Sequence, residues 1–228
     1  MNKEVYNQII QNIPANVQLV AVSKLKPASE VEAAYELGQR HFGENWAQEL
    51  KEKHEQLPKD IQWHFIGHLQ TNKIKYIIPY LHLIHSIDSF RLLQEVNRQA
   101  ARHERVVGCL LQFHIATEET KFGFSLEECL QMLQSPEFAT LHNVEICGVM
   151  GMASLTDDTA QIHREFATLR HYFQQLKEEF FAQQESFKEL SMGMTDDYTI
   201  AIEEGSTMIR VGSAIFGARD YGKLKIEN

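Results

Sequence analysis

The chain has 228 residues, 43% of them hydrophobic and 23% charged, and a formal net charge of −9 at pH 7. This is the composition of an ordinary globular protein, and the length suffices for one domain with one sizeable core. Nucleic-acid binders usually present a basic face, so the acidic balance disfavours a nucleic-acid partner.

Short apolar runs alternate with amphipathic helical patterns along the chain. After a predicted opening helix at 4–13, β-branched and aromatic runs predict eight strands, and stretches with charged faces predict helices between them. The predicted strands are 18–23, 41–42, 63–66, 82–86, 106–115, 144–149, 189–191 and 208–211. The predicted helices between them are 28–37, 47–56, 89–102, 126–133, 159–181 and 195–204.

This alternation predicts an α/β barrel. Eight strands leave roughly 28 residues for each unit, close to one βα repeat of a (β/α)8 barrel. An open doubly wound sheet is the alternative, but it usually has fewer strands and a glycine-rich first turn, which is not found after Ser23. We therefore predict a single domain over residues 1–228, a (β/α)8 TIM barrel with an extra N-terminal helix.

The first predicted strand ends on a charged residue, Lys24, shortly before Pro27. A charged amine at the end of a buried strand costs roughly several kcal/mol unless it is used, so this lysine suggests chemistry. The alternative is a lysine whose side chain bends out to solvent.

Two short apolar strands near the C-terminus open into small residues. The first leads into Met192-Gly193-Met194 and the second into Gly212-Ser213. Glycine lets backbone N–H groups approach an anion, and a helix N-terminus carries partial positive charge. Because the carboxyl ends of barrel strands share one mouth, and its last two loops commonly bind phosphate, we expect Lys24 to lie beside a phosphate site.

These residues resemble the pyridoxal phosphate homeostasis protein family, whose members are similar to the isolated barrel of alanine racemase. The matching stretches cover essentially the whole chain in order. They are VAVSK (20–24), FGEN (42–45), WHFIGHLQTNK (63–73), HSID (85–88), KFG (121–123), GVMGM (148–152), SMGM (191–194) and IRVGSAIFG (209–217).

The resemblance implies that the chain binds pyridoxal 5'-phosphate as an aldimine of Lys24, with Arg210 facing the pyridine nitrogen. It further implies four phosphate-binding residues and four residues that line the pocket. The first four are Ser191, Gly193, Gly212 and Ser213, and the second four are Asn45, His64, Ser86 and Met150. One departure is His114, where the family usually has asparagine before Glu118 and Lys121, so the hydrogen bonds at that strand end remain open.

An arginine at position 210 also bears on reactivity. A guanidinium is always a donor, so it keeps a pyridine nitrogen unprotonated, and such a ring is a weak electron sink. The cofactor would then be held rather than used for carbanion chemistry. The alternative is a surface arginine at a strand end.

No metal site is expected from the histidines. His64 and His68 are four residues apart, but Gly67 and the strand-like run before it argue against a helical metal pair. We expect His82 and His85 to lie on opposite faces of one strand, where they could not chelate together. Helix capping remains an alternative role for Asn45, Ser191 and Ser213.

The cysteines and the N-terminus predict a compartment. Cys109, Cys129 and Cys147 are odd in number and contain no Cys-x-x-Cys pair, so they indicate neither a disulfide framework nor a zinc ribbon. The first residues lack a signal-peptide core, and no run of 18 apolar residues occurs. We expect a cytoplasmic protein with no membrane partner.

Three functions remain open. The preferred one is a non-catalytic protein that buffers, protects or delivers pyridoxal phosphate, with apo forms of pyridoxal phosphate enzymes as partners, acting as a monomer or weak dimer. The second is a racemase or decarboxylase with the same cofactor, although a barrel filling the chain leaves no second domain to close the site. The third is a lysine Schiff-base aldolase without pyridoxal phosphate.

Overall fold

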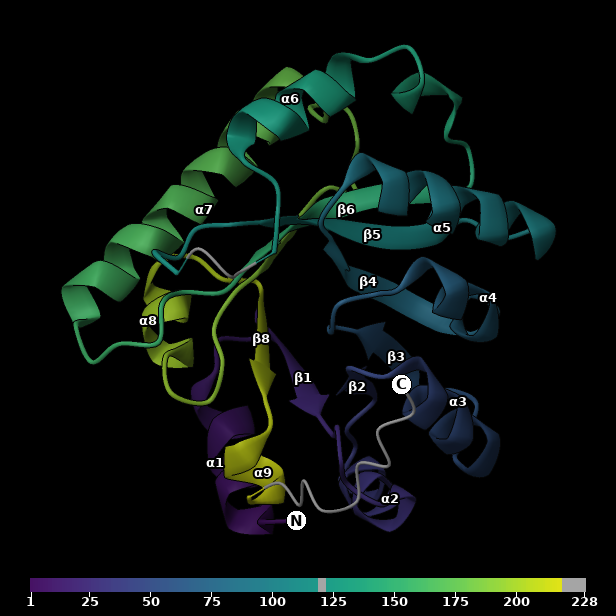
Figure 1. The fold of residues 1–228 in the computed structure, drawn as a ribbon. Coiled ribbons are helices and arrows are strands. Elements are labelled where there is room, and N and C mark those ends of the chain that lie inside the picture. Colours follow the sequence, from purple (N-terminus) through teal and green to yellow (C-terminus); the bar gives the residue numbers. More distant parts are fainter. Residues whose placement is uncertain (119–121, 219–228) are drawn as a thin grey trace.

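Eight parallel strands close into a barrel in chain order, with β8 pairing back to β1 (Figure 1). The computed structural model describes residues 1–118 and 122–218. The strands are β1 (Gln18–Val22), β2 (His41–Glu44), β3 (Gln62–Phe65), β4 (Leu81–Ile87), β5 (Val107–Phe113), β6 (Val144–Gly151), β7 (Glu189–Ser191) and β8 (Met208–Val211). The predicted (β/α)8 barrel is confirmed.

Helices cover the outside of the barrel. They are α1 (Lys3–Asn12), α2 (Ala28–Glu36), α3 (Ala47–Gln56), α4 (Ile74–Ile77), α5 (Phe90–Arg102), α6 (Leu126–Gln134), α7 (Thr159–Glu179), α8 (Tyr198–Glu203) and α9 (Ser213–Phe216). Short 3-10 helices occupy Thr71–Lys73 and Phe138–Thr140. The one-turn helices α4 and α9 fall outside the predicted helix ranges, because their apolar patterns are too short to show a helical period.

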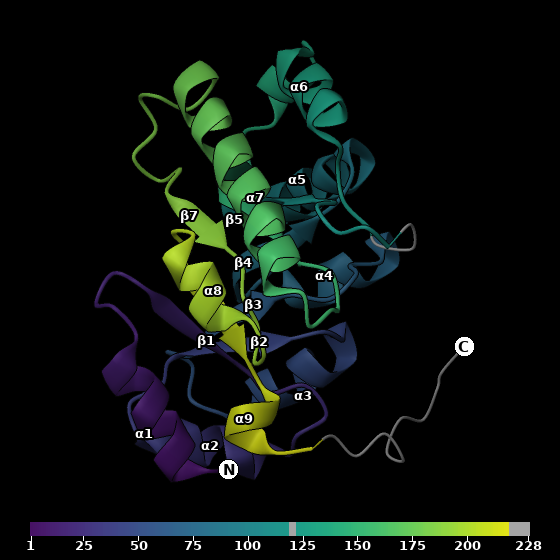
Figure 2. The same ribbon diagram turned by 90° about the vertical axis from the view of Figure 1, so that its left-hand side faces the viewer.

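The extra N-terminal helix α1 packs beside α9, where both views place it (Figure 2). The Asn2 side chain accepts a hydrogen bond from the backbone N–H of Val5 and so caps the helix. Tyr6 and Ile9 are buried on its inner face. The backbone N–H of Asn2 donates to the Ile215 carbonyl at 2.6 Å, which ties the start of α1 to α9.

Apolar side chains form two clusters. The larger one lies between the strands and the surrounding helices and includes Trp63, Phe42 and Phe166. The smaller one consists of Val20, Leu83, Leu110, Met150 and Met208 and comes from strand faces that do not meet the helices, so it fills the barrel interior.

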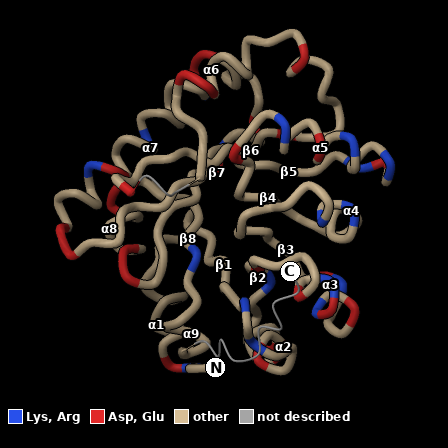
Figure 3. Tube along the Cα trace, in the orientation of Figure 1, with Lys and Arg blue, Asp and Glu red and all other residues tan. Residues whose placement is uncertain are grey.

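Charged residues lie mainly on the outer helices and loops, and the strands are mostly uncharged (Figure 3). One basic segment lies on β8, whose single basic residue is Arg210. That arginine is only 4% exposed, so it is a buried charge, which is costly unless partners satisfy it.

All three cysteines are free thiols. Burial raises the pKa of Cys129 to about 12 and that of Cys147 to about 11, and it raises the pKa of Cys109 as well. These thiols are therefore protonated and unreactive near neutral pH. As for membrane insertion, none of the helices described in 1–118 and 122–218 has the length and apolar character needed to cross a bilayer.

Candidate functional site

A cavity of about 530 Å³ opens at the carboxyl ends of the strands. It is lined by five of the ten residues predicted to bind the cofactor: Lys24, Asn45, Arg210, Gly212 and Ser213. These residues come from the loops after β1 and β2 and from the end of β8, segments far apart in the sequence. The barrel brings them to one mouth, as parallel strands require.

Lys24 is half-buried, and its backbone neighbours are firmly held. The Ser23 hydroxyl donates to Glu44 Oε1 at 2.6 Å. On the other side of the lysine, the backbone N–H of Leu25 donates to Glu49 Oε1 at 2.7 Å. Leu25 has a φ of 62°, a conformation that costs about 1–2 kcal/mol in a residue other than glycine. These contacts compensate for that cost and fix the direction in which Lys24 leaves the strand.

A buried ion pair underlies this arrangement. Lys53 Nζ lies 2.6 Å from Glu44 Oε1 and 2.8 Å from Glu49 Oε1, and it donates to the Ser23 carbonyl at 2.7 Å. Burial raises the pKa of Glu44, and the Lys53 ammonium opposes that rise. Both carboxylates that position the Lys24 segment are therefore joined through one ammonium group.

Arg210 lies inside the barrel below the cavity mouth. Its Nη1 donates to Ser191 Oγ at 2.6 Å, and its Nη2 donates to the Gly151 carbonyl at 3.1 Å. Burial lowers its pKa to about 10, and the nearby Asp197 carboxylate opposes the shift. The guanidinium therefore remains a cationic donor at neutral pH. Its two acceptors lie on β7, which pairs with β8, and on β6, which pairs with β7.

The loops after β7 and β8 meet at the same wall of the cavity. A Cβ on Gly212 would lie 3.0 Å from the Val22 carbonyl oxygen. Thr195 Oγ1 accepts from the Ser213 hydroxyl at 3.1 Å and from the Gly212 N–H at 3.4 Å. Small residues thus bring backbone N–H groups and two hydroxyls to one place, which suits an anion.

The other five predicted residues do not line the cavity. Met150 belongs to the apolar cluster inside the barrel, and Ser86 is 1% exposed near the end of β4. Ser191 contacts Arg210, and the Gly193 carbonyl accepts from the Arg210 N–H at 2.9 Å. These four residues do not border the cavity itself, and their roles in binding stay predictions.

His64, the fifth, belongs to a hydrogen-bonded chain that crosses the barrel interior. His64 Nδ1 is 2.8 Å from His85 Nε2, and His85 Nδ1 is 2.9 Å from Ser191 Oγ. His64 Nε2 is 2.9 Å from His41 Nδ1. Burial lowers the pKa of His64 and His85 well below the usual value, so these rings are neutral at pH 7.

The expectation that His82 and His85 lie on opposite faces of β4 is wrong. The register of β3 with β4 shifts, with Trp63 opposite Leu81 and His64 opposite Leu83. This irregularity places His82 as an extra residue and breaks the alternation of faces. Both rings therefore contact His64, with centroids 5.2 Å and 5.1 Å away.

Two buried polar atoms test whether the cavity region fits a polar ligand. Among the described residues, Asn45 Oδ1 and Ser86 Oγ are buried without a hydrogen-bond partner. Unpaired buried polar atoms are costly, so each calls for a partner. Asn45 lines the cavity, and its amide can meet a polar ring substituent there. Lys24, Asn45 and Arg210, which line the cavity, together fit a phosphorylated pyridine aldehyde.

Several residues that line the cavity were not among the ten predicted to bind the cofactor. Thr195 and Asp196 fall in the predicted helix 195–204, but the observed helix α8 begins only at Tyr198, so both residues lie in the loop before it. Phe122 belongs to the matching stretch 121–123, but no role was predicted for it. Thr195 follows the Met192-Gly193-Met194 turn directly, and that position was the available signal. Phe122 reaches the cavity across the mouth, and its ring stacks on His68 with centroids 4.4 Å apart.

At the departure from the family pattern, His114 Nε2 lies 2.8 Å from the Glu118 carbonyl oxygen. The imidazole can therefore donate to the backbone there as an asparagine amide would. Lys121, which the resemblance also includes, lies outside the described residues.

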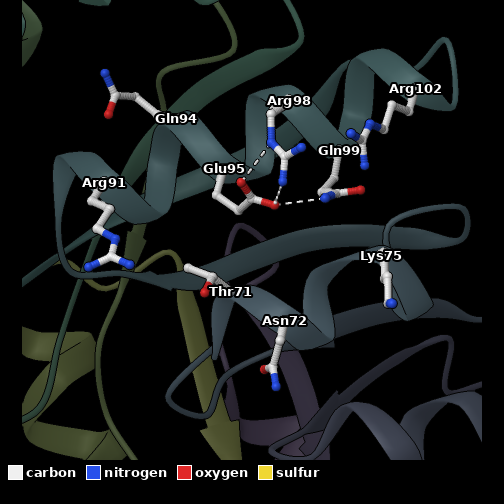
Figure 4. A pocket seen from close by; sticks show the side chains of 9 residues that line it. All are labelled: Thr71, Asn72, Lys75, Arg91, Gln94, Glu95, Arg98, Gln99 and Arg102. Atoms are coloured by element: carbon white, nitrogen blue, oxygen red, sulfur yellow. Dashed lines mark hydrogen bonds and ion pairs between the residues drawn. The ribbon is translucent and has the colours of Figure 1, made fainter.

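A second pocket lies outside the barrel, between α5 and the segment around α4 (Figure 4). Lys75, Arg91 and Arg102 line it, and Arg98 is paired with Glu95 at 2.6 Å. In the part of the chain that the structure describes, its lining residues come from α4, α5 and the 3-10 helix before α4, and it shares none of them with the cavity that contains Lys24.

The fold and the cavity define a barrel of the alanine racemase type. The family described as "Alanine racemase, N-terminal domain" matches residues 3–220. The alanine racemase of Clostridium difficile superposes with a TM-score of 0.76 at 15% identity, covering 95% of this chain and 59% of that chain. At that identity the likeness shows the fold alone.

Closer relatives narrow the class. The pyridoxal phosphate homeostasis protein of Pasteurella multocida is 38% identical over 210 residues, covering 91% of this chain and 88% of the relative. That of Synechocystis is 37% identical over 217 residues, covering 94% and 97%. PipY of Synechococcus elongatus, solved with pyridoxal phosphate bound, superposes with a TM-score of 0.85 at 36% identity, covering 94% and 99%. This chain belongs to the pyridoxal phosphate homeostasis protein family.

Proposed function

We propose that this chain binds pyridoxal 5'-phosphate through Lys24 and holds it in reserve, buffering, protecting or delivering it without catalysing a reaction of its own. The observation that carries the proposal is that Lys24, Arg210, Gly212 and Ser213 all line the same cavity. The pyridoxal phosphate bound to PipY supports it.

Each group has a distinct role in this proposal. The Lys24 amine condenses with the cofactor aldehyde and one water molecule is released, which masks a reactive carbonyl reversibly. The phosphate binds at the Gly212 and Ser213 wall, where Thr195 orients the Ser213 hydroxyl. Asn45, Ser86, His64 and Met150 are proposed to shape the pocket and its supporting layer, and Ser191 and Gly193 to support the anion site.

The Arg210 contact argues for storage over catalysis. A cationic donor at a pyridine nitrogen leaves that nitrogen unprotonated, so the ring withdraws electrons weakly from a bound amino acid. The two hydrogen bonds from Arg210 to Ser191 and Gly151 hold the guanidinium in this position, so no acidic side chain can take its place beside the pyridine nitrogen. We therefore infer that racemisation and decarboxylation are poorly supported at this site.

An absorption titration tests the binding proposal. Adding pyridoxal phosphate to the purified protein is expected to give a visible band distinct from the free cofactor. The Lys24→Ala variant is expected to lose this band, and the matched Lys26→Ala variant to keep it, since Lys26 donates to the Ala218 carbonyl instead. A band that persists unchanged in Lys24→Ala contradicts the proposal.

A turnover assay tests the storage role. Enzymes typically turn over at about 1 s⁻¹ or faster, and we expect the protein loaded with pyridoxal phosphate to racemise or decarboxylate amino acids far more slowly. Turnover of any amino acid at about 1 s⁻¹ that disappears in Lys24→Ala would favour the enzymatic alternative. A protein that forms no band but cleaves a sugar phosphate would favour the aldolase.

A further inference from the structure

Three histidines lie together in neighbouring strands, and none of them lines the cavity that contains Lys24. His41 is the first residue of β2 and His82 the second of β4, and His64 lies on β3 between them. These three strands are neighbours (Figure 1). One ring nitrogen from each histidine lies within 4.8 Å of the other two.

The register shift between β3 and β4 creates this cluster. It turns His82 inward, so its ring contacts both others, with centroids 5.6 Å from His41 and 5.2 Å from His64. His64 is fully buried, His41 is half-buried and His82 is exposed. The group is therefore anchored at one end and open to solvent at the other.

One nitrogen of the hydrogen-bonded pair His41 Nδ1 and His64 Nε2 carries a proton, because one of the two must donate and the other accept. A metal ion bound between the rings takes the place of that proton, so binding releases it or moves it to another ring nitrogen.

The spacing is near that of a tetrahedral site. Zinc–nitrogen distances of about 2.0–2.1 Å place the ligand nitrogens about 3.3 Å apart. The His41 Nδ1 to His64 Nε2 distance of 2.9 Å must open slightly, and the widest separation of 4.8 Å must close. Rotation of the exposed His82 side chain supplies that closure, because this ring makes no hydrogen bond to any described residue.

A second layer of contacts already supports the central ligand. His64 Nδ1 lies 2.8 Å from His85 Nε2, which leaves Nε2 as the nitrogen that faces the cluster. Histidine ligands usually donate their second ring N–H to a fixed partner, which sets the tautomer. His85 is that partner, and it is itself fixed by Ser191 Oγ at 2.9 Å.

We propose that His41, His64 and His82 form a binding site for a borderline divalent transition metal ion, best matched by Zn²⁺, with water as the fourth ligand. Imidazole suits Zn²⁺, Ni²⁺ and Cu²⁺, and the absence of a carboxylate from the trio disfavours Mg²⁺ and Ca²⁺. Three protein ligands and one open position form a known zinc arrangement.

Cobalt titration of the tag-free full-length protein tests this proposal. Co²⁺ is expected to bind one ion per chain, with the intense d–d absorption of four-coordinate cobalt, and Zn²⁺ is expected to displace it while Mg²⁺ does not. His82→Ala and His41→Ala are expected to weaken binding by at least about 100-fold, because loss of an outer-layer partner alone costs 10–100-fold. The control His142→Ala changes an exposed histidine in the loop before β6 and is expected to bind normally.

Several results would overturn the site. One is a Co²⁺ affinity in His82→Ala equal to that of the unchanged protein. Another is a weak absorption typical of six-coordinate cobalt, and a third is failure of Zn²⁺ to displace Co²⁺. Because His82 is exposed, its alanine variant is expected to fold, and circular dichroism verifies this for each variant.

Discussion

At the residue scale, the direction of Lys24 depends on two carboxylates that are not in the cavity. Glu44 holds Ser23 on one side of the lysine, and Glu49 holds the backbone of Leu25 on the other. The sequence predicted that Lys24 ends a strand, but not this clamp. The clamp joins β1 to β2 and α3, and such contacts between distant segments have no local pattern.

Replacing Glu49 tests the clamp. Glu49→Ala removes the acceptor for the Leu25 N–H, where φ is 62°, so Lys24 loses its fixed direction. We expect the Kd for pyridoxal phosphate to rise about tenfold, which corresponds to 1.4 kcal/mol. The control Glu52→Ala lies on the same helix, and the Glu52 side chain accepts a hydrogen bond from Gln48 Nε2 and makes no contact with the Lys24 segment among the described residues, so this variant should leave the Kd unchanged. Equal Kd values in both variants would contradict the clamp.

Ser191 is a second single residue with a measurable role. Its hydroxyl oxygen accepts a hydrogen bond from Arg210 Nη1 at 2.6 Å and lies 2.9 Å from His85 Nδ1. Ser191→Ala leaves both nitrogens buried without this partner, so we expect a loss of about 1–3 kcal/mol in the free energy of unfolding. Urea unfolding measures it. A change below about 0.5 kcal/mol would show that the hydroxyl does not stabilise this pair.

At the element scale, the order of strands and helices follows from periodicity, and the details of the strands do not. All eight predicted strands overlap observed ones, because buried parallel strands are continuous apolar runs between helical patterns. The irregular pairing of β3 with β4 could not be predicted. One extra residue in β4 changes which side chains point into the barrel, but it leaves no mark in the residue composition of the strand. That irregularity is why the histidine cluster was missed.

Gly193 in the loop after β7 and Gly38 in the loop before β2 offer a matched pair of glycine substitutions. Gly193 has a φ of 94°, and a Cβ there would lie 2.6 Å from the Ala201 Cβ. Gly38 has a φ of 98° with no atom within 4 Å of its Cβ position. We expect Gly38→Ala to cost about 1–2 kcal/mol from backbone strain alone. Gly193→Ala should cost about 1–3 kcal/mol more from overpacking.

The same pair distinguishes a structural from a binding effect. Gly193→Ala is expected to weaken pyridoxal phosphate binding as well, because the Gly193 carbonyl accepts from the Arg210 N–H. Gly38→Ala should bind normally, since it lies in the loop before β2. Thermal unfolding and an absorption titration measure the two effects. Equal stability of the two variants would contradict the close packing at Gly193.

At the scale of the whole molecule, a row of neutral histidines crosses the barrel and makes stability depend on pH. The pKa of His41 is lowered to about 4, and those of His64, His82 and His85 are also lowered, in each case chiefly by burial. In the unfolded chain these groups titrate near 6.5. The unfolded state therefore binds more protons than the folded state once the pH falls below that value.

The free energy of unfolding should thus be at its full value above about pH 6.5 and decrease as the pH falls toward 4. The slope is about 1.4 kcal/mol per pH unit for each histidine that titrates only on unfolding. Urea unfolding across this range checks it. His41→Gln should reduce the slope and the exposed His142→Ala should not. A stability that is constant or rises on acidification would contradict neutral interior histidines.

The central claim is that Lys24 carries the cofactor, and chemical trapping tests it most directly. Borohydride reduction of the protein loaded with pyridoxal phosphate fixes the carbon–nitrogen linkage, and mass spectrometry of its peptides locates the modified residue. We predict one modification per chain, at Lys24. A stable modification at Lys26 or elsewhere, with Lys24 unmodified, would contradict the claim.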